Sequence, residues 1–425
     1  MPKNNWKEFK LKELIEIKHG FAFPGKDITN QETDKILVTP GHFSVRGGFL
    51  NNHKKFFNGD FDKEYLLNGG DLILSMTDLS KEGDTLGFSA IVPDLNDKQL
   101  LHNQRVGKIK IINPIIEKYF LNYLLRTKKY RHWVLSTSTG STVRHTSPSR
   151  IGEYKFYLPP IKYQELISQT LKRFDDKIEV NQKIKKIYEE IPKTLFKSWF
   201  INFDPIRAKS KHRSTGLSKE IINLFPKSFE DSNLVKIPMK WKLLDFGKFT
   251  IPIRGKVITQ KDVNDGNIPV VAGGIEPAYY HNKSNVNGPV ITISASGANA
   301  GIVNLYQDSI WASDCSYISK EQTNYVFTCY VFLKIFQKKI FALQHGGAQP
   351  HINPNDLIRL KFIKPTNDLL DKFEKIIEPF FKSIQIIDHQ SVCLANIRDT
   401  LLPKIISGKL SNSGIEKFLN ETSVQ

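Results

Sequence analysis

Two short stretches of the sequence come nearest to known catalytic motifs, and neither of them matches. A methyltransferase acting on base amino groups needs an Asp/Asn-Pro-Pro-aromatic motif, and the nearest stretch, residues 202–205, lacks the second proline. The carboxylates of Asp94 and Asp97 are too close in sequence to surround one metal ion, as the carboxylates of a nuclease do. The sequence therefore predicts no catalytic residue. The alternative interpretation is a DNA methyltransferase or nuclease that uses an unfamiliar motif.

Motifs that hold nucleotides or metal ions are also missing from the sequence. No GxxxxGK[ST] loop is present to cradle ATP phosphates, and no glycine-rich dinucleotide turn follows a strand. The three cysteines, Cys315, Cys329 and Cys393, form no CxxC pair, which argues against a zinc cluster or a disulfide framework. His42 and His53 lack the close helical spacing of a zinc pair. We expect no metal and no cofactor in this chain.

The charge of the chain points to a polyanionic partner. The 425 residues include 61 Lys and Arg against 43 Asp and Glu, a formal net charge of +18. Such an excess attracts nucleic acid through phosphate neutralisation and counterion release. A basic protein from a Lys-rich proteome is the alternative interpretation, and a scaffold that binds only proteins would need no such charge.

Bulk composition predicts a folded chain that lies in the cytoplasm. Forty per cent of the residues are hydrophobic, which does not fit a disordered protein. The first residues lack the apolar core of a signal peptide, and no run of ~18 apolar residues could span a bilayer. We expect no membrane association.

Polar loops supply the side chains that could contact DNA. One pair of loops is 140–147 and 346–353, whose glycines allow close backbone approach. The other pair is 75–81 and 294–299, and Arg105 is a further candidate. Arg, Asn, Gln, Ser and Thr can contact bases, and Lys and Arg can contact phosphates. The predicted DNA-binding residues are Ser75, Thr77, Lys81, Arg105, Ser141, Thr142, Arg144, Ser294, Ser296, Asn299 and Gln349.

Each of these loops also has a purely structural interpretation. The first pair can be turns that lead into the last strand. His145 and His351 match between the two halves, whereas residues that read different targets should differ. The second pair differs in sequence, but surface loops also diverge by drift.

The strongest feature of the chain is an internal repeat. From Tyr119 to Phe200 the first half aligns without a gap to residues 206 positions later. Upstream, Trp6 aligns with Trp241 at a shift of 235, and the loops differ in length. The matched pairs include Gly140 with Gly346, His145 with His351, Pro148 with Pro354, Phe156 with Phe362 and Leu195 with Leu401. A duplicated scaffold with divergent loops suits two sites of one kind with different targets, although drift alone would look the same.

Short apolar runs bounded by turn residues predict the strands of each repeat. They are followed by a predicted helix, at 116–136 in the first repeat and 325–344 in the second, so we expect mixed α+β domains. The predicted strands are 36–39, 71–75, 88–92 and 108–112, then 268–272, 290–294, 301–306 and 316–319.

Each repeat ends in an apolar stripe with helical spacing. A helix over 161–200 would be ~60 Å long, and its stripe needs a partner. The copied stripe predicts a shared coiled-coil rod, and two helices packed on separate domains are the alternative. The predicted partner-binding residues are Ile167, Leu171, Phe174, Ile178, Phe373, Ile377, Phe380 and Ile384. Residues 201–240 read as an irregular surface connector.

The chain resembles the specificity subunit of type I restriction–modification enzymes from about residue 6 to 410. The second repeat departs from the pattern at Pro365-Thr366-Asn367, where a Pro-Pro and Gln-Glu signature is looked for. The motifs that carry the resemblance are 155–160 with Gln164-Glu165, 195–205, 224–226, 237–241 and 398–410.

The resemblance implies an α+β chain with two target-recognition domains joined by two long antiparallel coiled-coil helices. The domains would read the halves of a split double-stranded DNA sequence, and the helices would set the spacing and dock two modification subunits. Those partners would methylate adenine with S-adenosylmethionine, and restriction subunits would use ATP and magnesium. The implied segments are 1–158 and 241–366 as recognition domains, 159–203 and 367–410 as helices, 204–240 as linker and 411–425 as tail.

Overall fold

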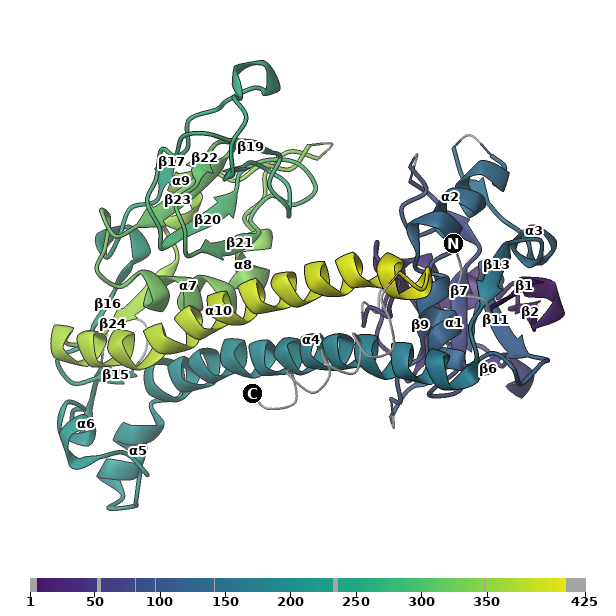
Figure 1. The fold of residues 1–425 in the computed structure, drawn as a ribbon. Helices are drawn as coiled ribbons and strands as arrows, with labels where there is room; N and C mark the ends of the chain where they lie inside the picture. Colours follow the sequence, from purple (N-terminus) through teal and green to yellow (C-terminus); the bar gives the residue numbers. More distant parts are fainter. Residues whose placement is uncertain are drawn as a thin grey trace. The chain divides into compact units, whose positions relative to one another are not determined.

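The computed structural model divides the chain into two compact units (Figure 1). The first unit comprises residues 1–179 and 391–425, and the second comprises 180–390. The structure describes residues 6–51, 55–80, 82–95, 97–140, 142–231, 236–347 and 349–409. The predicted six-segment division stays a prediction.

A four-stranded antiparallel sheet, in the order β2-β11-β7-β9, forms the centre of the first unit. A five-stranded sheet, β3-β5-β4-β10-β6, lies in the same unit. The bounds of the strands are β1 Lys7–Lys10, β2 Ile15–His19, β3 Ile28–Thr29, β4 Lys35–Val38, β5 Phe56–Phe57, β6 Leu66–Leu67, β7 Leu72–Ser75, β8 Thr77–Asp78, β9 Ser89–Ile91, β10 Gln99–His102, β11 Val106–Ile111, β12 Arg144–His145 and β13 Lys155–Leu158.

Strand β7 illustrates why these segments form strands. It reads Leu-Ile-Leu-Ser, and every residue is buried because both faces of the sheet are covered. A continuous apolar run is typical of such a strand. Gly70, two residues before the strand, has a φ of 84°, a conformation that favours glycine.

The predicted helix at 116–136 is two helices, α1 Lys118–Leu124 and α2 Lys128–Thr137. The hydroxyl of Thr127 accepts a hydrogen bond from the Tyr130 backbone N–H and starts the second helix as an N-cap. The prediction of one continuous helix was wrong because Thr127 has extended backbone angles and caps a second helix within the apolar pattern. A short helix, α3 Pro148–Gly152, completes this unit's globular part.

The second unit repeats the central sheet as β17-β23-β20-β21, beside a three-stranded sheet, β19-β18-β22. Here too the predicted helix, at 325–344, is two helices that meet at Phe336. The bounds are β14 Phe229–Asp231, β15 Lys236–Pro238, β16 Lys242–Asp245, β17 Ile253–Arg254, β18 Ile268–Val271, β19 Tyr279–His281, β20 Val290–Ser294, β21 Val303–Tyr306, β22 Trp311–Ala312, β23 Cys315–Ser319, β24 Lys361–Lys364, α7 Val326–Ile335, α8 Gln337–Phe341 and α9 Pro354–Leu357.

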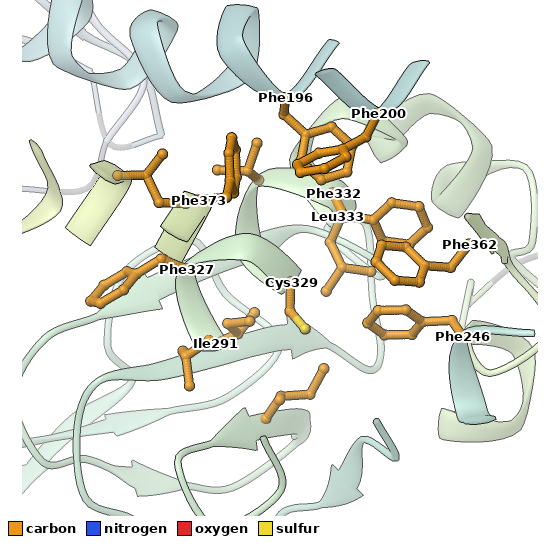
Figure 2. Close-up of a cluster of buried hydrophobic side chains, with 14 of the residues drawn as sticks. Phe196, Phe200, Phe246, Ile291, Phe327, Cys329, Phe332, Leu333, Phe362 and Phe373 are labelled. Atoms are coloured by element: carbon orange, nitrogen blue, oxygen red, sulfur yellow. The ribbon is translucent and has the colours of Figure 1, made fainter. Parts of the chain in front are cut away.

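Aromatic side chains dominate the core of the second unit (Figure 2). Phe373 lies among them, with its ring centroid 4.8 Å from that of Phe200 and 5.9 Å from that of Phe196. Phe332 stacks on Phe246 at 5.1 Å. Aromatic pairs at such distances stabilise a core beyond the area that they bury.

The predicted irregular connector is largely structured. It contains α5 Asp204–Ser210, α6 Lys219–Asn223 and the antiparallel pair β14–β15. Ile206 and Phe225 are buried and pack into the core of the second unit. The prediction of an irregular surface connector was wrong because these apolar side chains anchor the segment to the core of the second unit.

Two long helices run through both units, α4 Ile161–Phe196, which a π-helical turn Lys197–Ile201 extends, and α10 Asn367–Ile406. In the first unit, the start of α4 packs against the end of α10, where Ile167 and Leu171 share a core with Leu402.

In the second unit, the other halves of the two helices pair. Lys185 binds Asp388 at 2.8 Å, and the ring of Tyr188 lies 5.5 Å from that of Phe380. Because residue numbers rise along α4 as they fall along α10, the helices are antiparallel. The mixed α+β architecture with two long packed helices is confirmed.

Candidate nucleic-acid interface

Three loops of the first unit meet at the end of strand β7. Met76 follows that strand, and its N–H donates to the carbonyl of Arg105 at 2.9 Å. The carbonyl of Met76 accepts from the N–H of Thr146 at 3.0 Å. The backbone of one residue therefore joins the Arg105 loop to the hairpin of residues 139–146.

The second unit builds the same junction from equivalent residues. The N–H of Ala295 donates to the carbonyl of Asp314 at 3.2 Å, and its carbonyl accepts from the N–H of Ile352 at 2.9 Å. The internal repeat thus extends to individual backbone hydrogen bonds.

The hairpins beside the two junctions also match. Thr139 and His145 exchange backbone hydrogen bonds in the first unit, and His345 and His351 do so in the second. These positions are 206 residues apart, as in the sequence repeat. His145 and His351 therefore occupy equivalent positions in two equivalent hairpins.

Three predicted DNA-binding residues are buried at these junctions: Ser75, Thr77 and Ser294. The Ser75 hydroxyl donates to the Thr77 carbonyl at 3.0 Å, and the Ser294 hydroxyl donates to the Gly273 carbonyl at 2.9 Å. The Thr77 hydroxyl lies 3.1 Å from Nδ1 of His145. Buried hydroxyls with such partners hold the loops in place, and a role of these three residues in contacting bases stays a prediction.

The other described candidates lie at the surface or close to it. Arg105, Thr142 and Gln349 are exposed, and Asn299 is partly exposed. Arg105 has no ion-pair partner in the part of the chain that the structure describes. Its guanidinium is available for a phosphate or a base.

Two further candidates are partly buried and have intramolecular partners. The Arg144 guanidinium donates to the Ser138 hydroxyl at 3.4 Å, and the Ser296 hydroxyl donates to the Asp314 carboxylate. Lys81 and Ser141 lie outside the described residues.

The loop after β7 is held by a buried carboxylate. Asp78 accepts hydrogen bonds from the backbone N–H of Ser80 at 2.7 Å and from the Thr85 hydroxyl at 2.6 Å. Burial raises the pKa of Asp78, but these hydrogen bonds outweigh it and leave the pKa below its usual value. The charged carboxylate therefore fixes the loop at neutral pH.

An arginine that sequence reasoning missed closes the same loop. Arg131 of α2 donates to the carbonyls of Gly83 and Leu86, and its guanidinium lies 4.7 Å from the Phe88 ring centroid. Its partners are backbone atoms of a loop more than 40 residues away, so no local pattern could reveal it. A preorganised loop loses less entropy when it binds a partner.

The residues predicted to bind partner subunits mostly pack inside their own units. Ile167, Leu171, Phe373 and Ile377 are fully buried. Phe174 is 8% exposed. Ile178, Phe380 and Ile384 are partly buried. Most of these side chains pack within the cores of their units, and their role in binding a partner stays a prediction.

Several apolar side chains on the same helices are exposed instead. The repeat-related residues Val180 and Ile386 are 45% and 67% exposed. The repeat-related residues Ile191 and Ile397 are 37% and 39% exposed. The two long helices therefore carry matching exposed apolar positions.

Metal-binding clusters and reactive thiols were sought among the described residues. These residues contain no group of three or more His, Cys, Asp or Glu that could hold a metal ion. Burial raises the pKa of the Cys315 thiol to about 12 and that of Cys329 well above its usual value, which disfavours a thiolate. Within the same residues, none of the helices combines the length and apolarity needed to cross a membrane.

Comparison with known proteins finds similarity along nearly the whole chain. Residues 3–189 match the family described as "Type I restriction modification DNA specificity domain". The type I restriction enzyme MjaIX specificity subunit of Methanocaldococcus jannaschii is 27% identical, covering 76% of this chain and 75% of that protein. The HindI specificity subunit of Haemophilus influenzae is 24% identical, covering 96% of this chain and 100% of that protein.

A solved structure shares the fold. The S subunit of a type I restriction–modification system from M. genitalium superposes with a TM-score of 0.54 at 17% identity. The match covers 95% of this chain and 97% of that one.

Proposed function

Because the chain belongs to the type I restriction–modification specificity subunit family, we propose that each unit recognises one half of a split double-stranded DNA target. The observation that carries this proposal is the pair of loop junctions. They share backbone hydrogen bonds around Met76 and Ala295 but present unlike side chains, Arg105 in one and Asp314 in the other. Two junctions with the same backbone but different side chains suit two units that recognise different half-sites.

The long helices set the distance between the two half-sites. Both α4 and α10 continue from one unit into the other without interruption. Two readers on one face of B-DNA sit ~34 Å apart or a multiple of that distance. Linking two weak readers by such helices raises the affinity for a correctly spaced site.

The exposed apolar positions of the helices dock two modification subunits. Each exposed apolar position occurs twice, once on α4 and once on α10. The repeat-related pairs are Val180 with Ile386 and Ile191 with Ile397. A surface that is repeated within one chain suits two copies of one partner.

Catalysis belongs to the partner chains. Modification subunits use S-adenosylmethionine to methylate adenine, and restriction subunits use ATP and magnesium to cleave unmodified DNA. The specificity subunit supplies sequence recognition and positions these partners on the duplex.

Selection from a library of random duplexes tests the proposal. The full chain, with co-expressed modification subunits, is expected to enrich one two-part sequence with a fixed gap, and its affinity is expected to fall steeply with salt. Enrichment of no sequence, or of one continuous sequence read by a single unit, would overturn the proposal.

A further inference from the structure

The hydrogen bonds of the two units identify equivalent residues where the sequence alignment is weak. Gly20 in the first unit and Gly255 in the second both pass close to another backbone segment. A Cβ atom on Gly20 would lie 2.1 Å from the His102 carbonyl oxygen, and one on Gly255 would lie 2.4 Å from that of Ser313. Only glycine fits such an approach, so these two glycines mark the same crossing point.

The residues that follow these glycines occupy the same backbone position. The N–H of Phe21 donates to the carbonyl of His102 at 2.8 Å. The N–H of Lys256 donates to the carbonyl of Ala312 at 2.9 Å. One unit therefore presents an aromatic ring where the other presents a cation.

The residues that precede the glycines also differ between the units. His19 and Arg254 are both exposed. Nδ1 of His19 lies 3.3 Å from the Gln104 carbonyl oxygen, beside Arg105. The Arg254 guanidinium pairs with Asp314 at 2.5 Å. His19 and Arg254 therefore each contact the loop whose backbone carbonyl, that of Arg105 or Asp314, bonds to the residue after the central strand β7 or β20.

Phe21 is unusual for a surface residue. Its side chain is 42% exposed, although it rests on Phe23 at 5.3 Å and on Tyr65 at 5.1 Å between ring centroids. These two rings support it from the protein side and leave the rest of the ring open. The N–H of Gln104, which precedes Arg105, donates to the carbonyl of Phe21 at 2.9 Å, so the two residues lie on adjoining backbone segments. An exposed aromatic ring and an exposed arginine on adjoining segments suit a ligand that offers both flat rings and negative charge.

We propose that this strip of residues determines which bases each unit reads, an inference that rests on the proposed function. We name it the recognition strip. It comprises His19, Phe21 and Arg105 in the first unit and Arg254, Lys256 and Asp314 in the second.

The chemistry of each strip predicts how it reads DNA. Arg105 can bind the O6 and N7 of a guanine as a bidentate donor. Phe21 can stack on a base or act as an apolar wedge at a base step. In the second unit, Asp314 orients Arg254 for a similar contact, and Lys256 binds a phosphate or a guanine.

Selection from the random-duplex library with variants of the full chain tests this inference. Arg105→Ala and Phe21→Ala are expected to relax the preference in one half-site, with discrimination reduced ~10-fold at the affected base pairs. Arg254→Ala is expected to relax the other half-site only. Arg105→Lys keeps the charge but loses bidentate geometry, so it is expected to retain affinity and lose discrimination.

Matched controls are the exposed lysines Lys155 of β13 and Lys242 of β16, which lie outside the strip. Lys155→Ala and Lys242→Ala are expected to leave both half-sites unchanged, and thermal unfolding checks that every variant is folded. If the strip variants select the wild-type sequence with full discrimination, the inference is overturned while the proposed function stands. If the wild-type chain selects no sequence, the proposed function fails first.

Discussion

Asp175 of α4 forms an ion pair with Arg398 of α10 in the first unit, and the Arg398 side chain is only 8% exposed. The same carboxylate binds the Arg126 guanidinium at 2.8 Å and accepts from the Tyr123 hydroxyl at 2.9 Å. Burial raises the pKa of Asp175, but the two guanidinium groups outweigh it and lower the pKa below its usual value. One carboxylate thus joins both long helices to the globular part of this unit.

Replacing this carboxylate is expected to destabilise the first unit strongly. Asp175→Ala leaves the nearly buried Arg126 guanidinium without its carboxylate and removes one of the two carboxylates that pair with Arg398, the other being Asp399. Removing one partner of such a buried pair typically costs ~3–5 kcal/mol. Chemical denaturation of the full chain measures the loss. Since the pKa is lowered in the folded state, the contribution is present above the ordinary Asp pKa and is lost as pH falls. A loss below ~1 kcal/mol, the range of a surface pair, would show that the network contributes little.

Glu374 is expected to make the stability of the second unit depend on pH. Its carboxylate accepts from the backbone N–H groups of Phe327 and Thr328, both at 2.8 Å. Burial nevertheless raises its pKa to about 7. A pKa raised in the folded state gives stability that is lost as pH rises from the usual Glu value to about 7. Denaturation between these pH values should show a slope that Glu374→Gln removes, and equal slopes would contradict the assignment.

Exposed apolar residues on the long helices are expected to bind modification subunits. Val180→Asp and Ile386→Asp should each weaken that binding by one to two orders of magnitude, because a charge would be buried at the interface. Their thermal unfolding should match the wild type, since both side chains are largely exposed. Isothermal titration with purified modification subunits measures the effect, and unchanged affinity of the double variant would rule out this surface.

Lengthening both helices is expected to lengthen the gap in the target. Seven helical residues inserted after Glu179 and after Gln390 preserve the heptad spacing and add ~10 Å. That length corresponds to at most ~3 base pairs at 3.4 Å each. Duplex selection should recover both half-sites with a wider gap, whereas an unchanged gap would show that the helices do not set the spacing.

The sequence predicted the strands and long helices well because their apolar patterns are strong. Strands β7 and β20 are mostly apolar, and the copied stripe predicted the helix pair. It could not predict that Ser75 and Thr77 are buried, because a hydroxyl after a strand looks the same whether it faces solvent or core. Arg131 and Gly20 were missed for a related reason, since their partners lie far away in the chain.

The map of methylated adenines in a genome tests the central claim most directly. The chain would be co-expressed with its modification subunits, and methylation would be read at every position. The account predicts one split motif with a fixed gap, and Arg105→Ala should relax one half of that motif only. Methylation at a continuous motif, or relaxation of both halves together, would contradict two units that read separate half-sites.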